Sequence, residues 1–572
     1  MLLNIRAAPY KTTWLFFLLA YAFLVLYLLI SNNLHSNSFA GVSFFMFSTM
    51  LMLLSLGIPV AFALGSVAII SALIFKPSLV SMLLYEFKGF TYESGKTLVA
   101  IPLFIFMGLL LHHSGIAKDL FKAVHVWSGR LRGGLGVGTV MVCALMAAMI
   151  GVSSAATISM GIIAVPAMLA HNYDKKLAVG IVQASGALGF LIPPSIMMIM
   201  YAFIAQESVG RLFAAGIIPG IMLASIYMIY ILAVGYFKPS AVPVHENDET
   251  VTLLYKISLL KHLVLPIAIV GVVLGSIFFG VASPTEGAAI GAIGALICAL
   301  MRKGLDTSVL KKSLSKTLSL TSFNAYIIIG AMAFSSIYSG LGASSALKEF
   351  IVALNVDPLV VVLIMQLSFF IFGMFLDDIA ILFLSMPIYV PIIEELGLSP
   401  IWFAVLFVMN MQMAYITPPY GLNLFYMKSV APKEVSLTDI YKAVTPFIIL
   451  QAIALFIVFF FPSLVLWLPS FIFDYLVILV DPETIFTNLS SLKNYPSLVS
   501  IFIENPSMTF DIGNFTSIAN NPISSKVLMS SVSFNEFLLY SDDFRMLLND
   551  NRWMSDFKLV SSFLEKNPGF LK

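Results

Sequence analysis

The chain has 572 residues, a length that would correspond to several soluble domains. Its composition excludes that class, because 60% of the residues are hydrophobic and 10% are charged, against about 45–50% and about 25% in soluble domains. The formal net charge of +2 gives no reason to expect nucleic acid as a partner. Cys143 and Cys298 both lie in apolar segments, so we expect buried thiols rather than a disulfide scaffold. The sequence is therefore that of an all-α polytopic membrane protein.

Apolar stretches of membrane-spanning length follow one another along the first 467 residues. A bilayer core about 30 Å thick requires roughly 20 apolar residues per helix. On this basis the predicted spans are 14–31, 42–56, 59–75, 97–113, 177–203, 212–237, 262–279, 284–301, 318–338, 400–427 and 443–467. The first span follows Arg6 and Lys11, as a signal peptide would, but it is longer than the usual core of about 7–15 residues. We interpret it as a retained anchor helix.

Two further apolar regions, 137–170 and 356–393, are too long for one helix, and a polar cluster interrupts each near its middle. The interruptions are Gly151-Val152-Ser153-Ser154 and Asp377-Asp378. Because each half is marginal for a crossing, both regions are predicted to be re-entrant hairpins. Amphipathic segments at 115–130 and 340–354 are expected to be interfacial arms.

The basic residues support this topology. With the N-terminus in the cytoplasm, the predicted cytoplasmic segments hold 19 lysines and arginines and the opposite face holds 5. Such a bias is the signature of the positive-inside rule. It requires both hairpins to be re-entrant, because two crossings in place of either would invert every later loop.

The two halves of the chain resemble each other. Equivalent residues recur at an offset of 221–230 positions: Pro59 and Pro284, Lys118 and Lys348, Pro166 and Pro387, and Pro193-Pro194 and Pro418-Pro419. Each half therefore contains five spans and one hairpin, and an odd number of crossings inverts the second copy. Inverted repeats with interrupted helices indicate a secondary transporter whose site lies near the membrane midplane. A channel could also be built from repeats, but it would not need paired hairpins facing broken helices.

The predicted organisation follows from this repeat. It consists of an extra anchor helix in 1–41, a first repeat in 42–237, a cytoplasmic linker in 238–261, a second repeat in 262–467 and a polar C-terminal extension in 468–572. The extension is placed on the outer face by the span count. Its role is not readable from its composition.

Two of the predicted spans contain breaks, at 186–195 and 415–423. Adjacent prolines remove two backbone donors and disfavour helix at the residue before them, and the glycines permit left-handed turns. What remains is a set of free carbonyl groups, together with the hydroxyls of Ser195 and Thr417 and the amide of Asn423. Such neutral, oxygen-rich surroundings suit a small monovalent cation. The alternative is a proline kink that serves packing alone.

The hairpin tips add further polar groups. Ser153, Ser154 and Thr157 at the first tip are weak indicators, because small hydroxyl residues also let helices pack closely. Asp377 and Asp378 at the second tip are stronger, since a carboxylate at membrane depth normally faces a cavity, an ion or a partner. The alternative for these aspartates is an ordinary interhelical hydrogen bond.

Other motifs do not support catalysis. Residues 133–138 are glycine-rich, but no Lys-Ser/Thr follows and no strand precedes, so a phosphate loop is excluded and ATP hydrolysis is not expected. His112-His113 lacks convergent zinc ligands. An intramembrane aspartyl protease would need two acidic motifs, yet Tyr173-Asp174 lies in a polar turn and 373–377 lacks the Gly-x-Gly-Asp spacing. We therefore expect no enzymatic activity.

The order and spacing of these motifs resemble the large membrane subunit of the TRAP (tripartite ATP-independent periplasmic) transporters, of the C4-dicarboxylate permease type. The similar segments, which span roughly residues 42–467, are Gly57–Gly65, Ile101–Gly108, Gly186–Ser195, Ser283–Ala288, Leu376–Ala380 and Thr417–Leu424. The resemblance implies an elevator-type importer of the bacterial inner membrane, with scaffold and transport parts, driven by sodium. It also implies a periplasmic solute-binding protein and a separate small membrane subunit of four helices as partners.

The same resemblance implies the site and its ligands. Sodium, as the coupling ion and without other cofactors, would be held at Ser153, Ser154, Gly186, Asp377, Thr417 and Gly421. The wider ion- and substrate-binding set adds Thr157, Gly189, Ser195, Asp378 and Asn423. The substrate would be an organic acid of dicarboxylate, sialic-acid or oxo-acid type. A stand-alone sodium/dicarboxylate carrier, which shares the inverted-repeat logic, is the closer alternative.

Overall fold

The computed structural model describes residues 39–83, 85, 88, 98–128, 131–151, 153–242, 252–302, 304–353, 356–373, 376–418 and 421–476. Every regular element in these ranges is a helix, which confirms the predicted all-α class. The chain divides into two compact units, residues 1–466 and 467–572. In the second unit the described residues end in the π-helical turn Ser470–Leu476. The predicted anchor helix 14–31 and nearly all of the C-terminal extension lie outside the described residues.

The helices of the first half follow the predicted order. They are α2 (Phe39–Ser55), α3 (Val60–Phe75), α5 (Ala100–His113), α6 (Ile116–Ser128), α7 (Gly134–Ile150), α8 (Ser153–Ala170), α9 (Lys175–Ala187), α10 (Ile196–Ala205) and α11 (Val209–Phe237). The pair α7–α8 occupies the first predicted hairpin, and α6 is the first predicted arm. The short 3₁₀ turn Leu188–Phe190 separates α9 from α10, at the predicted break.

The second half repeats this succession helix for helix. Its helices are α12 (Leu253–Phe278), α13 (Pro284–Met301), α14 (Thr307–Gly340), α15 (Ala343–Ala353), α16 (Pro358–Gly373), α17 (Asp378–Glu395), α18 (Pro400–Tyr415), α19 (Leu422–Val430) and α20 (Leu437–Phe460), followed by α21 (Ser463–Pro469). Both α8 and α17 have 18 residues, and each end of α17 lies 225 residues after the same end of α8.

Polar caps fix where several of these helices begin. In each case a side-chain oxygen accepts a hydrogen bond from a backbone N–H of the first turn, which that turn would otherwise leave unsatisfied. The capping residues include Asp174 (α9), Ser195 (α10), Ser283 (α13), Asp306 (α14), Ser399 (α18) and Ser436 (α20).

Two predicted spans begin several residues after the start of the helix that contains them. The structure starts α12 at Leu253 rather than 262 and α14 at Thr307 rather than 318. The added turns carry lysines, which hydropathy assigns to a loop although lysine is a good helix former. A third span, 443–467, is interrupted, since α20 ends at Phe460 before Pro462. A proline there removes a backbone donor and disfavours helix in the residue before it.

Helix length and composition single out fewer candidate crossings than the eleven predicted spans, of which 14–31 lies outside the described residues. Among the described residues, five helices are long and apolar enough to cross a membrane alone: α8, α11, α13, α14 and α20. A sixth results if α5 and α6, which meet at a 60° bend, are counted as one span. Of the remaining predicted spans, breaks divide 177–203 and 400–427, and α2, α3 and α5 have only 14–17 residues. Span 262–279 lies in α12, whose apolar part Val264–Phe278 is also shorter than a membrane span.

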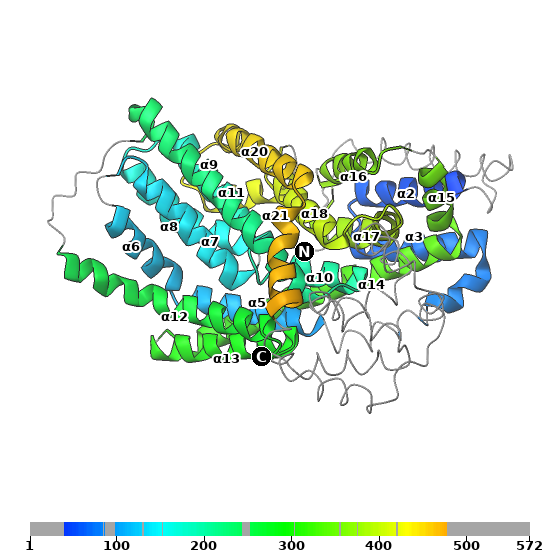
Figure 1. Ribbon diagram of the computed structural model, residues 1–572, viewed down its shortest axis with the longest axis horizontal. Helices are drawn as coiled ribbons and strands as arrows, with labels where there is room; N and C mark the ends of the chain where they lie inside the picture. Colours follow the sequence, from blue (N-terminus) through cyan, green and yellow to red (C-terminus); the bar gives the residue numbers. More distant parts are fainter. Residues whose placement is uncertain are drawn as a thin grey trace, which may run out of the picture. The chain divides into compact units, whose positions relative to one another are not determined.

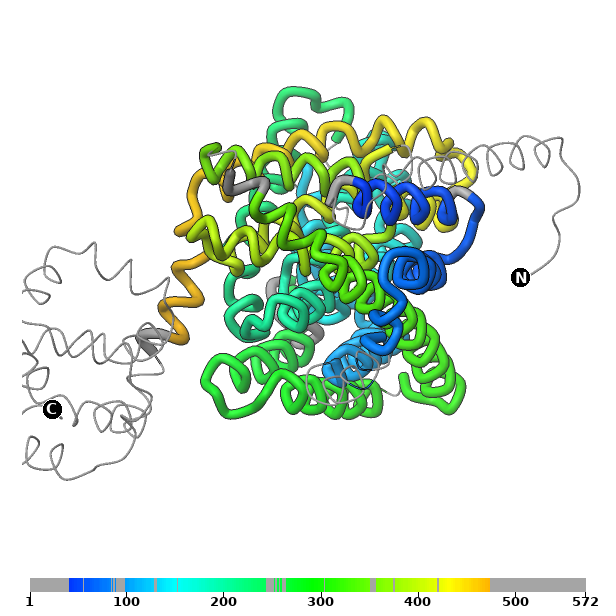
Figure 2. The backbone as a smooth tube through the Cα atoms, turned by 90° about the vertical axis from the view of Figure 1, so that its right-hand side faces the viewer, coloured from blue at the N-terminus to red at the C-terminus, as the bar shows by residue number. Residues whose placement is uncertain are grey.

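The helices pack around a centre formed by α18. Its residues from Ile401 to Ala414 are all buried, as expected for a helix that is apolar on every side. In Figure 1, α7, α8, α9 and α11 lie together in one part of the first unit, and α2, α3, α15 and α17 in another. The long helix α14 runs against α3 and α5, and the blue tube of α2 and α3 lies beside green α14 in Figure 2 as well.

Ion pairs join the arms and helix ends. Arg302, just after α13, pairs with Asp119 of the arm α6, and Lys348 of the arm α15 pairs with Glu395 at the end of α17 at 2.8 Å. Lys175 pairs with Asp439 at 2.9 Å and so joins the first turns of α9 and α20. These half-exposed pairs contribute at most about 1 kcal/mol each, so they set orientation more than stability.

The topology can be tested with single cysteines. Lys176→Cys and Ser308→Cys should react with a membrane-impermeant maleimide only from the cytoplasmic side, and Glu207→Cys and Ser345→Cys only from the opposite side. The native cysteines are both buried, so their background labelling should be low. Labelling of Lys176→Cys from outside would mean that α7 and α8 cross the membrane fully, and the predicted inverted repeat would be lost.

Candidate ion and substrate site

The tip of the first hairpin forms where α7 ends at Gly151. This residue has φ +64°, and a Cβ atom built on it would lie 2.6 Å from the carbonyl oxygen of Pro194. Glycine adopts this left-handed conformation without steric cost and leaves room for the neighbouring backbone. The first tip therefore packs directly against the first helix break.

Two hydroxyl groups follow the tip at the start of α8. Ser153 Oγ and Thr157 Oγ1 are both buried and have no hydrogen-bond partner among the described residues. Thr157 also contacts Gly186, near the end of α9, where a Cβ atom would collide with its hydroxyl. A buried hydroxyl without a partner costs about 1–3 kcal/mol. Because hard cations take oxygen ligands, the two hydroxyl oxygens are candidate ligands for such a cation.

The tip of the second hairpin presents two carboxyl groups. Asp377 and Asp378 lie beside each other at the start of α17, close to the backbone N–H groups of Ile379 and Ala380. Even so, Oδ2 of Asp377 is buried without a hydrogen-bond partner among the described residues. A buried acidic oxygen without a partner is a candidate ligand for a cation.

The second break brings backbone carbonyl groups together. A Cβ atom built on Gly421 would lie 2.7 Å from the Tyr415 carbonyl oxygen and 2.8 Å from that of Thr417. The tip of the second hairpin adjoins this break, since Gly373 at the end of α16 contacts Ala414 at the end of α18. Pro419 and Tyr420 lie outside the described residues.

The two breaks touch each other. The rings of Phe190 and Tyr415, which stand 225 residues apart, meet edge to face with centroids 5.0 Å apart. Asn423, at the start of α19, donates a hydrogen bond from Nδ2 to the carbonyl oxygen of Gln183 on α9 at 3.1 Å. The Oδ1 atom of Asn423 is buried without a partner among the described residues. Residues from the two halves thus form one continuous centre.

A central cavity of about 120 Å³ lies where the tips and breaks meet. Gly151, Ser154, Asp377 and Asp378 line it from the two tips, and Phe190 and Tyr415 from the two breaks. Asn324 of α14 closes one side. Of the predicted binding residues, Ser154, Asp377 and Asp378 therefore share one cavity.

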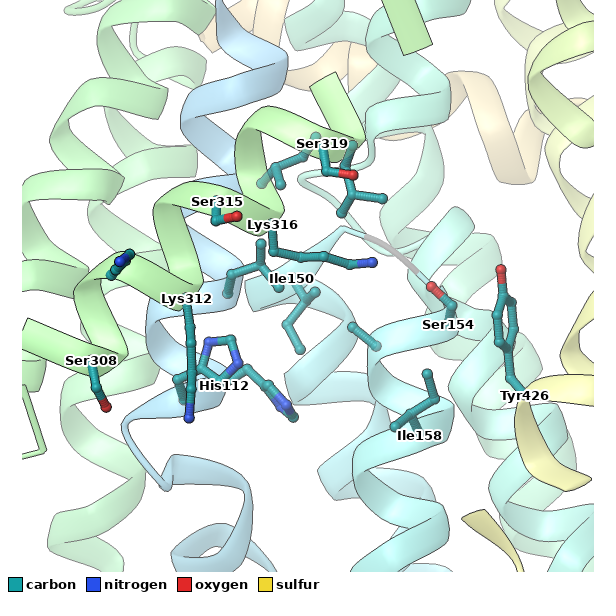
Figure 3. A pocket seen from close by; sticks show the side chains of 16 residues that line it. His112, Ile150, Ser154, Ile158, Ser308, Lys312, Ser315, Lys316, Ser319 and Tyr426 are labelled. Atoms are coloured by element: carbon teal, nitrogen blue, oxygen red, sulfur yellow. The ribbon is translucent and has the colours of Figure 1, made fainter. Parts of the chain in front are cut away.

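A larger cavity of about 760 Å³ adjoins the central one, and Ile105, Ser154, Leu320 and Tyr426 line both. Figure 3 shows Lys312 and Lys316 reaching into it from α14, His112 from α5, and Ser154 and Ile158 from α8. Its volume lies in the range of small-molecule sites.

The remaining predicted residues lie around these cavities. Gly189 is buried in the 3₁₀ turn at the first break. The sequence predicted that the hydroxyls of Ser195 and Thr417 are available as ligands. In the structure both donate to backbone carbonyl groups, Ser195 to that of Phe190 at 2.6 Å and Thr417 to that of Met413 at 2.7 Å. A residue that caps a helix or continues its last turn uses its hydroxyl locally.

The sequence interpretation missed several cavity residues. Lys312 and Lys316 counted only as cytoplasmic charges, and His112 and His113 only as a helix end. In the structure His112 Nδ1 lies 2.7 Å from Ser159 Oγ, and His113 Nδ1 lies 3.1 Å from Ser313 Oγ. The i, i+4 spacing of polar residues at the start of α14 was the available signal for a polar face.

Comparison with known proteins shows the family of the chain. The family model described as "Tripartite ATP-independent periplasmic transporter, DctM component" matches residues 47–464. The chain belongs to this family. It is 32% identical to a C4-dicarboxylate TRAP transporter large permease protein of Pseudomonas aeruginosa over 72% of this chain and 94% of the relative. It is 27% identical to a sialic acid TRAP transporter large permease protein of Vibrio cholerae, over 74% of this chain and 97% of the relative.

A solved structure shares the fold. It is the crystal structure of the Alcanivorax borkumensis YdaH transporter, with a TM-score of 0.50 and 13% sequence identity over 68% of this chain and 88% of that chain. At this identity the likeness concerns the fold alone. The matched relatives are transporter permease components rather than enzymes. An intramembrane aspartyl protease would need Asp174 as its second catalytic carboxylate. Asp174 instead caps α9, because it accepts hydrogen bonds from the N–H groups of Lys176 and Leu177.

Members of the DctM family are large permeases that work with a small membrane subunit and a periplasmic binding protein. With its membrane-length helices, this TRAP large permease is a multi-pass membrane protein.

Proposed function

We propose that this chain is the ion-coupled, translocating subunit of a sodium-driven importer of organic acids in the bacterial inner membrane. The observation that supports this most directly is the central cavity, which both hairpin tips and both helix breaks line. A transporter must bind ion and substrate where its two halves meet. A protein that needed hairpins and breaks only for packing would have no reason to direct two carboxyl groups into that cavity.

Sodium as the coupling ion is supported by the unpartnered oxygens. Ser153 and Thr157 beside Gly186 offer one set, and Asp377 near the Tyr415 break offers another. The two sets occupy corresponding places in the two halves, one for each hairpin. A carboxylate that balances a cation can also stand close to an anionic substrate, which it would otherwise repel.

The inverted repeat and the elevator mechanism are supported by the equal lengths of α8 and α17 and by matching corners. Contact between Phe190 and Tyr415 is what a pseudo-two-fold axis between the halves requires. Gly115 (φ +83°) and Gly342 (φ +78°) stand at the corners between α5 and α6 and between α14 and α15, and a Cβ atom at either would meet nothing within 4 Å. Corners of this kind can act as hinges between long scaffold helices and moving hairpins.

The partners and the substrate follow from the family. We propose that a small membrane subunit of four helices and a periplasmic solute-binding protein work with this chain, as in other TRAP systems. The relatives named for C4-dicarboxylates and for sialic acid have in common a substrate with a carboxylate group. The lysines of the larger cavity favour the same chemical class here.

Reconstitution tests the proposal. Proteoliposomes that contain the chain and its small subunit should take up radiolabelled succinate only with both an inward sodium gradient and the binding protein. Panels of sialic acid and of 2-oxo acids should be run in parallel. Sodium-driven uptake without any binding protein would favour the stand-alone carrier. Uptake that ignores the sodium gradient for every acid would refute the coupling.

A further inference from the structure

The larger cavity contains a group of basic side chains that the central site does not use. We name it the basic vestibule, defined by Lys311, Lys312 and Lys316 of α14 and by His112 and His113 of α5. No acidic residue is found among the described residues that line it. Its volume of about 760 Å³ exceeds that of the central cavity several-fold and admits an organic acid of modest size.

The lysines reach the vestibule because of helix geometry. Ser308, Lys312, Ser315 and Ser319 follow one another at intervals of four, three and four residues, and Lys316 lies four residues after Lys312. Residues so spaced share one face of a helix. All five line the cavity. In Figure 3, Lys316 extends across the cavity toward Ser154 at the first hairpin tip. This face of α14 thus places ammonium groups opposite the moving hairpin.

The described residues around the vestibule balance its positive charge only in part, because no acidic residue is among those that line it. The nearest described carboxylate on the same helix, Asp306, caps α14 by accepting from the N–H of Val309 at 2.7 Å. This hydrogen bond lowers the pKa of Asp306, so it stays ionised at the cap, where it also feels the charge of Lys312. A cleft lined by one sign of charge concentrates ions of the opposite sign.

The vestibule adjoins the central cavity, since Ile105, Ser154, Leu320 and Tyr426 line both. An anion that left the hairpin tips on this side would therefore pass the lysines. Lysine is a flexible point charge without the fixed fork of arginine. It therefore attracts carboxylates without demanding one geometry, as suits a site of passage.

We propose that the basic vestibule is a second, weaker anion-binding site, which holds the carboxylate substrate between the hairpin tips and the cytoplasm. This inference rests on the proposed function for the direction of passage. It adds a binding site on the scaffold helix α14, separate from the hairpin tips and independent of sodium.

Charge at the vestibule can be measured without transport. Ser315→Cys in the complete detergent-solubilised complex should react faster with the anionic 2-sulfonatoethyl methanethiosulfonate than with its cationic trimethylammonium analogue, after normalisation to free thiol. Lys312→Gln with Lys316→Gln should lower this rate ratio about tenfold at low salt, because two nearby charges are removed. Buried Cys143 and Cys298 keep the background low.

Binding is tested with the same cysteine. Succinate at millimolar concentration should slow the labelling of Ser315→Cys, with or without sodium, and the double lysine variant should lose this protection. The matched control is Lys118→Gln with Lys122→Gln on α6, which removes two exposed lysines that do not line the vestibule. It should change neither the rate ratio nor the protection.

The outcomes separate this inference from the proposed function. Protection that persists in Asp377→Asn, with transport lost, would place the anion site apart from the ion site as proposed. Equal normalised rates for the two reagents, or protection that the double lysine variant retains, would overturn the vestibule while leaving sodium-driven uptake untouched. If uptake proves independent of sodium but protection depends on the lysines, the proposed coupling fails and the anion site stands.

Discussion

Replacing Asp377 by asparagine should leave insertion and assembly intact while reducing sodium-driven uptake to less than about a tenth of wild type, equivalent to more than about 1.4 kcal/mol. The substitution keeps the size of the side chain and one acceptor oxygen but removes the charge. Oδ2 of Asp377 is buried and unpartnered among the described residues. The amide oxygen of asparagine can still accept from the nearby N–H groups of Ile379 and Ala380, so the hairpin should stay folded. A sodium titration of uptake in proteoliposomes measures the effect.

The matched control lies at the other end of the same hairpin. Asp357 accepts a hydrogen bond from the N–H of Leu359 at 2.8 Å, and asparagine caps helices about as well as aspartate. Asp357→Asn should therefore show wild-type uptake and an unchanged sodium titration. If Asp377→Asn behaves in the same way, the coupling role is refuted and Asp377 is a structural acceptor.

Much of the backbone was predictable because the signals are local. Span 284–301 coincides with α13, and the breaks at 186–195 and 415–423 appear where adjacent prolines and glycines interrupt the apolar pattern. Prolines and glycines act on their own and neighbouring residues, so a single sequence suffices to find them. The regular offset of about 225 residues then orders the two halves.

The cavity was less predictable because it depends on contacts between distant residues. The hydrogen bond from Asn423 to Gln183 joins residues 240 positions apart, and no periodic pattern in the sequence predicts it. The lysines of α14 were predicted to lie in a loop, because a span predicted from hydropathy stops at the first charged residues. In the structure the helix continues through them. The sequence predicted that the hydroxyls of Ser195 and Thr417 have no protein partner, because they lie at helix breaks. In the structure both donate to nearby backbone carbonyl oxygens, as hydroxyl side chains at helix ends commonly do.

The second large effect concerns the docking of the first hairpin tip. Gly151→Ala should reduce uptake more than about tenfold and lower the thermal stability of the complex, because the left-handed conformation alone costs alanine about 1–2 kcal/mol. In addition, the new Cβ would stand 2.6 Å from the Pro194 carbonyl oxygen, a backbone atom that cannot turn away. The tip must then withdraw from the break, and the central cavity opens. Uptake and a thermal unfolding curve, recorded on the same preparation, measure both consequences.

Alanine substitutions at two further glycines distinguish the cost of a left-handed backbone from the cost of a steric clash. Gly57 has φ +79° and nothing within 4 Å of a built Cβ, so Gly57→Ala should lose stability but keep most transport. Gly65 lies within α3 with nothing within 4 Å, and alanine there should be neutral or stabilising, since alanine favours helix by about 1 kcal/mol over glycine. If Gly151→Ala impairs uptake no more than Gly57→Ala does, the steric clash with the Pro194 carbonyl oxygen does not affect transport. The first tip would then not depend on close contact with the break.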